Sequence, residues 1–146
     1  THEGDRALVE DLLQALQQDH VDYTVFWRRL SVAVRESAHS THAFEPVRDL
    51  FLHREVFDDW CMRYLDRLGS ANRQATGDAM LRTNPKYILR NHLGELAIRQ
   101  AKQGDFAMVQ DLLLVLHAPF DEHPTYEAWA GLAPEWASSI EISCSS

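Results

Sequence analysis

The sequence contains only two cysteines, Cys61 and Cys144, in 146 residues. Two are too few for a disulfide scaffold, and so low a number fits a reducing compartment. A long apolar run is also missing, since the longest uninterrupted aliphatic stretch, residues 112–116, is far shorter than the ~20 residues that cross a bilayer. The sequence therefore predicts a protein that has no membrane as a partner.

Clusters of positive charge are missing as well. The formal net charge is −8, and the acidic residues are spread along the chain. Because no group of Lys and Arg is large enough to neutralise several phosphates, nucleic acid is not expected as a partner. The composition is otherwise ordinary for a globular protein, and the length suffices for one domain with a real hydrophobic core.

Apolar residues recur at three- and four-residue steps through most of the chain, the spacing of amphipathic helices. Gly77 is interpreted as a weak point of its helix, worth about 1 kcal/mol relative to alanine. Asn84 is expected to cap a long helix, with Pro85 in its first turn, where a missing N–H is no loss. The predicted helices are residues 5–18, one capped by residues 22–24, a short one after the polar break 39–42, then 54–68 closed by Gly69, 71–83, 85–103 closed by Gly104, and 106–116.

Turn-forming residues become frequent after His117, with at most one short helix, around residues 125–130. The residues 140–144 alternate apolar and polar, which is typical of an extended tail. The predicted fold class is therefore all-α: a single helical domain of about six or seven helices with a turn-rich, extended C-terminal tail. The expected boundaries are residues 1–136 for the helical domain and residues 137–146 for the tail.

No constellation of residues in the sequence assigns a catalytic, cofactor-binding or metal-binding site. The histidine pairs His39/His42 and His117/His123 are interpreted as structural or solvent-facing, because zinc requires three or four converging ligands. A glycine-rich phosphate loop and a catalytic aspartate loop are not found either. Nucleotidyl transfer cannot be completed within these residues.

Arg90 and Asn91 are polar residues beside the apolar seam of a predicted helix. Two roles stay open for them, which are to bond carbonyl groups at a loop or to dock the helix on another domain. Cys61 shares an apolar helical face and is expected to be an inert core thiol. Cys144 lies between serines near the C-terminus, so its thiol is expected to be accessible, which is one of the requirements for a reactive cysteine.

Several segments together resemble the C-terminal region of the selenoprotein O (YdiU-like) family. Weaker family features lie upstream, in residues 22–24 and around Trp60, so the resemblance covers essentially the whole chain. The segments that carry it are residues 84–91 (NPKYILRN), 97–98, 104–105, 119–121, 134–136 and the terminal residues 143–146.

The resemblance implies that the chain is a fragment, in agreement with its start at Thr1 rather than at methionine. Members of the family have a protein-kinase-like fold, long classed as pseudokinase, and act as protein adenylyltransferases. They bind ATP with Mg²⁺ or Mn²⁺ and transfer AMP to Ser, Thr or Tyr hydroxyls of substrate proteins. The family's ATP- and metal-binding residues precede Thr1, so the implied partners are an upstream kinase-like domain of the same chain and the substrate proteins.

One functional position of the family maps onto this sequence. Cys144 matches the near-terminal cysteine or selenocysteine that is implicated in redox control, either with a cysteine near the catalytic cleft or with Cys61. A cysteine at this place is similar to bacterial members, which implies a cytoplasmic protein, whereas eukaryotic relatives are mitochondrial. Two alternatives remain: a non-catalytic helical protein–protein interaction module, and a structural cap on the kinase-like lobe.

Overall fold

The computed structural model describes residues 2–139, and within this range it contains helices and connecting segments but no β-strand. The predicted all-α class is confirmed. The chain divides into two compact units, residues 1–84 (unit 1) and residues 85–146 (unit 2). Among residues 2–139 no helix is both long and apolar enough to cross a membrane. The extended conformation predicted for residues 140–144 lies outside the described residues.

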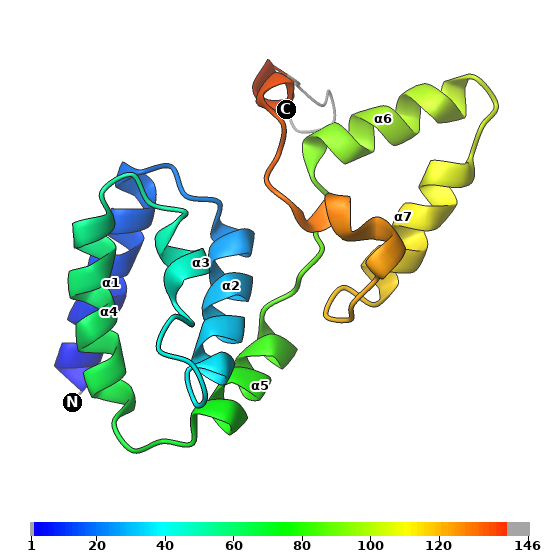
Figure 1. Cartoon of the computed structure of the whole chain (residues 1–146). Coiled ribbons are helices and arrows are strands. Elements are labelled where there is room, and N and C mark those ends of the chain that lie inside the picture. Colours follow the sequence, from blue (N-terminus) through cyan, green and yellow to red (C-terminus); the bar gives the residue numbers. More distant parts are fainter. Residues whose placement is uncertain (1, 140–146) are drawn as a thin grey trace. The chain divides into compact units, whose positions relative to one another are not determined.

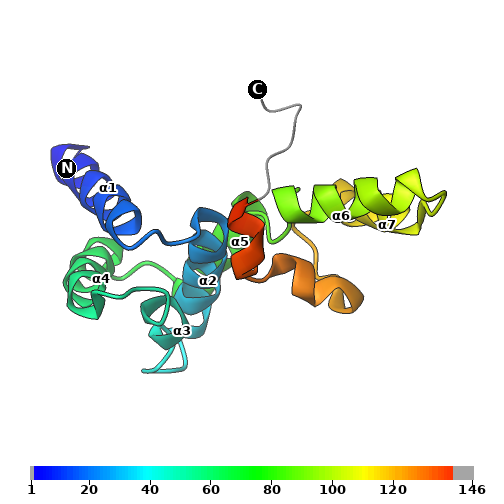
Figure 2. The same ribbon diagram turned by 90° about the horizontal axis from the view of Figure 1, so that it is seen from above.

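Unit 1 consists of five helices whose termini follow local sequence signals. Figures 1 and 2 show α1 beside α4 and α2 beside α5. The Asp22 carboxylate accepts a hydrogen bond from the backbone N–H of Val25, which confirms the predicted cap. Gly69 ends its helix with a φ of 54°, a conformation that suits glycine. The helices are α1 (His2–Gln18), α2 (Tyr23–Glu36), α3 (Glu45–Arg48), α4 (Arg54–Leu68) and α5 (Arg73–Thr83).

The core of unit 1 is built around aromatic rings. Phe26 is fully buried, with its ring centroid 6.0 Å from that of Phe51 and 6.3 Å from that of Trp60. The indole N–H of Trp60 donates a hydrogen bond to the Leu8 carbonyl at 2.9 Å, which ties α4 to α1. The apolar face predicted for residues 54–68 is confirmed, because Phe57 and Trp60 are both buried in it.

Gly77 lies where α5 packs closely against α2, and the interpretation of this residue as a weak point is wrong. A Cβ atom at position 77 would lie 2.5 Å from the backbone nitrogen and from the Cβ of Arg35. Real Cβ atoms do not approach other heavy atoms so closely. Glycine therefore permits the crossing of the two helices, and its propensity deficit is outweighed by the packing that it allows.

The long helix predicted for residues 85–103 is also wrong, because α6 begins only at Asn91. Asn84 caps the end of α5 instead: its side-chain amide donates to the Met80 carbonyl at 2.9 Å. Its own carbonyl accepts from the guanidinium of Arg28 at 3.1 Å. The physical reason is Pro85, which disfavours the α conformation at the residue before it and leaves Asn84 extended.

Unit 2 contains the hairpin of α6 (Asn91–Lys102) and α7 (Ala107–His117), followed by the 3₁₀ helices η1 (Pro124–Ala130) and η2 (Glu135–Ser139). Figure 1 shows α7 folding back on α6 after Gly104, whose φ of 85° closes the first helix as predicted. The short helix expected around residues 125–130 is confirmed as η1, but the expectation of at most one short helix after His117 is wrong, because η2 is a second one. One small buried cluster consists of Leu93, Ala97 and Leu112 with partly buried neighbours, and Tyr87 and Val115 are buried as well.

A histidine–carboxylate pair in unit 1 predicts a pH dependence of stability. Asp19 accepts hydrogen bonds from the backbone N–H of His53 at 2.9 Å and from its Nδ1 at 2.6 Å. The hydrogen bond and the charge of Asp19 raise the pKa of His53 above its usual 6.5. Its stabilising contribution is therefore complete below the pKa of the unfolded chain and is lost as the pH rises through the raised folded pKa.

Urea unfolding followed between pH 5.5 and 9 should show this loss on the alkaline side of about 6.5. His53→Gln keeps a hydrogen-bonding side chain without the charge change, and its unfolding midpoint should vary less over the same range. Because the other seven histidines are shared by both proteins, the difference between the two curves isolates His53. Identical curves would contradict the prediction.

Candidate functional site

A groove of about 670 Å³ lies in unit 2, between the segment that enters α6 and the segment around η2. Residues 88–92 form one side, and Ala133, Pro134, Glu135 and Ala137 form the other. Arg90 and Asn91, for which docking of another domain is one of the two roles left open by the sequence, both line it. The structure thus places them together in a concave surface, and their docking role stays a prediction.

The groove combines apolar walls with a few polar groups. Arg90 contributes a cation and Glu135 a carboxylate, whereas Ile88 and Leu89 present exposed aliphatic side chains. His92 is buried, and its ring meets the ring of Trp136 edge to face at 5.8 Å. Burial, followed by the charge of Arg90, lowers the pKa of His92, so this imidazole is neutral at pH 7.

Residues 86–87, which precede the groove-lining residues 88–92, are attached to the rest of unit 2 by backbone hydrogen bonds. The N–H groups of Lys86 and Tyr87 both donate to the Pro119 carbonyl, at 2.9 and 3.2 Å. These bonds attach the segment to the loop after α7 and take the place of the helical bonds that the sequence had suggested.

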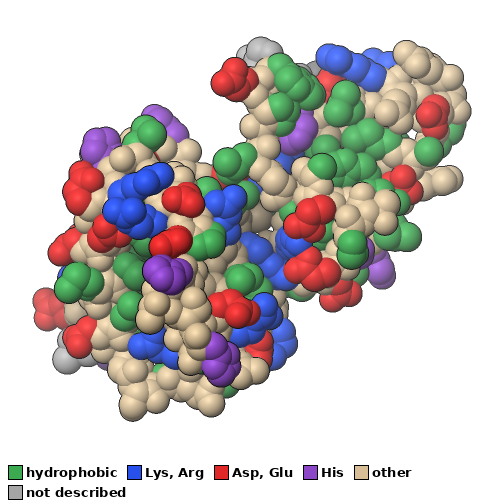
Figure 3. Space-filling view, viewed as in Figure 1, with side chains coloured by type: hydrophobic (Ala, Val, Ile, Leu, Met, Phe, Trp, Pro, Cys, Tyr) green, Lys and Arg blue, Asp and Glu red, His purple; other side chains and the backbone are tan. Residues whose placement is uncertain are grey.

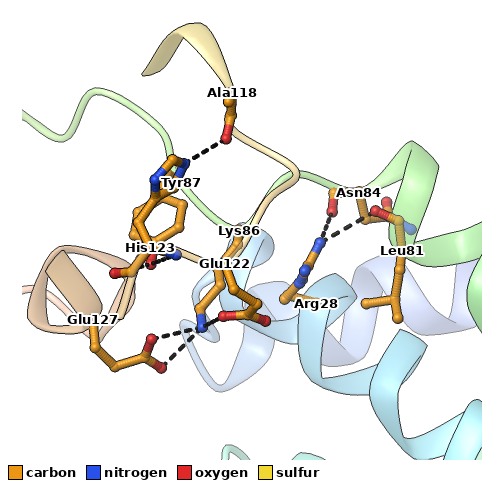
Figure 4. A network of polar contacts seen from close by, with 9 residues as sticks. All are labelled: Arg28, Leu81, Asn84, Lys86, Tyr87, Ala118, Glu122, His123 and Glu127. Atoms are coloured by element: carbon orange, nitrogen blue, oxygen red, sulfur yellow. Dashed lines mark hydrogen bonds and ion pairs between the residues drawn. The ribbon is translucent and has the colours of Figure 1, made fainter. Parts of the chain in front are cut away.

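Lys86 fixes the same segment through its side chain, which is only 13% exposed. Its ammonium group bonds the Glu127 carboxylate at 2.7 Å and also the carboxylate of Glu122 (Figure 4). Burial by itself lowers the pKa of Lys86, but the hydrogen bonds to Glu122 and Glu127 outweigh it and raise the pKa overall. The ammonium group is therefore charged at neutral pH and links the loop to η1.

Tyr87 is the largest fully buried side chain of unit 2. Its hydroxyl donates to the His123 carbonyl at 3.1 Å and accepts from the His123 N–H at 3.3 Å. The His123 ring stands edge-on to Tyr87 at 5.2 Å, and its Nε2 donates to the Ala118 carbonyl at 2.8 Å (Figure 4). This network holds residues 86–87 rigidly, immediately before the groove.

Sequence reasoning found Arg90 and Asn91 but missed Lys86, Tyr87 and His92. One signal was available, because Pro85 favours an extended conformation at Asn84 and argues against a helix that starts there. The partners of Lys86 lie 36 and 41 residues away along the chain. No local spacing rule pairs residues at such separations.

The other predicted sites are not among the residues that line the groove, or they fall outside the described residues. Cys144 belongs to the latter, so its accessibility stays a prediction. Cys61 is buried in unit 1 as expected, and burial raises the pKa of its thiol to about 11. His42 bonds the Glu45 carboxylate at 2.9 Å. Over residues 2–139 no three His, Cys, Asp or Glu side chains gather as metal ligands.

Comparison with known proteins identifies the family. A family model described as protein adenylyltransferase SelO matches residues 1–117, a range that includes all of unit 1 and the α6–α7 hairpin. The match assigns the chain to a family whose members are named protein nucleotidyltransferases. It belongs to the SelO (YdiU) family, and the resemblance seen in the sequence is confirmed.

Individual relatives agree with the family match over nearly the whole chain. A protein nucleotidyltransferase YdiU from Variovorax paradoxus (strain S110) is 53% identical over 144 residues, which are 99% of this chain and 28% of the relative. The proteins of the same name from Albidiferax ferrireducens and Burkholderia cenocepacia (strain HI2424) are 51% and 49% identical and are covered to 28% and 27%. The chain thus spans little more than a quarter of the length of these relatives.

Proposed function

We propose that this chain is the C-terminal accessory part of a protein adenylyltransferase with a kinase-like, pseudokinase fold. The complete protein transfers AMP from ATP to Ser, Thr or Tyr hydroxyls of other proteins. The observation that carries this proposal is the family match over residues 1–117, combined with the 27–28% share of the relatives that the chain represents. The remaining length of such proteins is sufficient for a separate catalytic body.

In this arrangement ATP and its Mg²⁺ or Mn²⁺ are bound by the catalytic body that precedes Thr1. The partners of the protein are its own kinase-like domain and its substrate proteins, and its compartment is the bacterial cytoplasm.

The groove of unit 2 gives the accessory part a means of docking. Its aliphatic walls suit the side chains of a protein segment, and Arg90, Asn91 and Glu135 place two charged groups and an amide among them. Concave sites that are mostly apolar with a few polar groups are typical of specific binding. We assign the docking of the catalytic body on unit 2 to Arg90 and Asn91.

Cys144 serves redox regulation in this proposal. Oxidation of Cys144 and a second thiol forms a disulfide with the release of two protons and two electrons to an oxidant such as oxidised glutathione. Cys61 is a poor second thiol, because it is buried and its pKa of about 11 keeps it protonated at neutral pH. A cysteine near the catalytic cleft of the body is therefore the preferred partner.

Adenylylation by the full-length protein provides the test. Transfer of radiolabelled AMP to a substrate protein should differ between oxidised glutathione and dithiothreitol, and Cys144→Ser should abolish the difference. Cys61→Ser serves as the matched control and should leave the difference intact. Equal transfer under both conditions in the parent protein would contradict the redox role, whereas absence of transfer under any condition would contradict the adenylyltransferase assignment.

A further inference from the structure

The helix α7 carries an apolar surface that unit 2 does not bury. Phe106, Leu113 and Leu114 are 56%, 65% and 58% exposed. Residues seven and eight positions apart lie on one side of a helix, so the three side chains form one stripe, here named the α7 face. Gln110 and His117 are the polar residues on the same side, and neither is acidic.

The composition of α7 indicates that this face is covered in the complete protein. Its sequence is AMVQDLLLVLH, yet only Leu112 and Val115 are buried. A helix that is apolar around most of its circumference is typical of a helix that is surrounded by protein. In contrast, α1 is apolar on one side only: it buries Leu12, Ala15 and Leu16 and exposes mostly polar and charged residues.

Unit 2 has a small core, and several of its large apolar side chains are exposed instead of buried. Among its described residues only five apolar side chains are buried, those of Tyr87, Leu93, Ala97, Leu112 and Val115, against thirteen in unit 1. The core of a domain of this size supplies only a few kcal/mol, so a partner that covers further apolar surface would stabilise it. Figure 3 shows apolar side chains gathered on unit 2 between α6 and α7, whereas those on the visible face of unit 1 are interspersed with charges.

We propose that the α7 face is buried against the polypeptide that precedes Thr1, so that α7 is the apolar anchor of unit 2 on the catalytic body. This inference rests on the proposed function. The relatives are covered to only 27–28%, so most of their length lies outside this chain. A catalytic body in the same polypeptide is present near unit 2 at an effective concentration on the order of millimolar. A second copy of the chain would have to reach a similar concentration in solution to compete for the α7 face.

The character of the α7 face fits a permanent contact. It consists of large aliphatic and aromatic side chains without a carboxylate or an ammonium group among them. Permanent interfaces are the more hydrophobic class and resemble a domain core that has been cut in two. The body should therefore present a complementary apolar patch rather than a charged one.

Hydrogen exchange of α7 tests the inference in two proteins, the 146-residue chain and the full-length protein that contains it. Backbone exchange across Ala107–His117 should be slower in the full-length protein by roughly tenfold or more, because burial suppresses local opening. The double variant Leu113→Glu/Leu114→Glu should return α7 of the full-length protein to the rate of the short chain. Met62→Glu is the matched control, since Met62 is 73% exposed on α4 and should leave α7 unchanged.

Three results would overturn the inference. The first is equal exchange of α7 in both proteins. The second is a clear change of α7 exchange caused by the double variant in the 146-residue chain alone, which would mean that unit 1 covers the face. The third is a concentration-dependent dimer of the short chain that Leu113→Glu dissolves. AMP transfer measured on the same full-length protein separates these results from a failure of the proposed function, because the contact of α7 is read independently of activity.

Discussion

Gly77→Ala is expected to destabilise unit 1 by about 3 kcal/mol or more, at the upper end of the effects of overpacking. The added Cβ would lie 2.5 Å from the backbone nitrogen of Arg35. A clash with a flexible side chain is relieved by a rotamer change, but a clash with backbone can be relieved only by moving α5 away from α2. That movement would open the packing around Met80 and Phe26, which belong to one core.

Urea denaturation followed by tryptophan fluorescence measures this effect, because Trp27 and Trp60 both lie in unit 1. Gly131→Ala is the matched control. The nearest atom to a Cβ at position 131 is 3.5 Å away, an ordinary contact, and the φ of Gly131 is −76°. An unfolding midpoint of Gly77→Ala equal to that of the control would show that α2 and α5 do not approach as closely as described.

Tyr87→Ala is expected to destabilise unit 2 by about 3–5 kcal/mol, the range for removing a large buried aromatic side chain. Tyr87 is 2% exposed and makes two hydrogen bonds to the backbone of His123. Its loss should detach residues 86–90 from the loop after α7. As a consequence, the side of the groove formed by residues 88–92, which includes Arg90, would no longer be held in place.

Hydrogen exchange resolved by peptide separates the response of unit 2 from that of unit 1, which serves as the internal reference. Exchange in Asn91–Lys102 should accelerate in Tyr87→Ala while exchange in α2 stays the same. Tyr87→Phe keeps the ring and removes only the hydroxyl bonds, so its effect should be about 1–2 kcal/mol. Equal effects of the two variants would mean that the hydroxyl, rather than the buried ring, holds the segment.

The local features of the fold were predictable to the extent that neighbouring residues determine them. The Asp22 cap and the glycines that end α4 and α6 depend on groups within one helical turn, and each is found where the sequence places it. The start of α6 was predicted six residues too early, at Pro85 rather than Asn91. There the backbone N–H groups of Lys86 and Tyr87 bond the Pro119 carbonyl, so the segment is not helical although its apolar residues have helical spacing.

The candidate site was predictable only in part for the same reason. Arg90 and Asn91 stand out as polar residues beside apolar ones, which is visible in the sequence. Their position in a groove with Glu135 is not visible, because it requires the chain to return past α7 and η1. The contact of the buried His92 with Trp136 also forms only because the chain returns past α7 and η1.

The sequence by itself determined the all-α class, the amphipathic faces of the helices and the family. These properties follow from periodicity, caps and residue identity, which act over a few neighbouring residues. The tertiary structure alone decided the division after Asn84, the need for glycine at position 77 and the groove before α6. The physical reason is that each of these depends on the approach of backbone segments far apart in the chain, such as Lys86 and Glu127, and only the folded chain selects which of many possible pairs are formed.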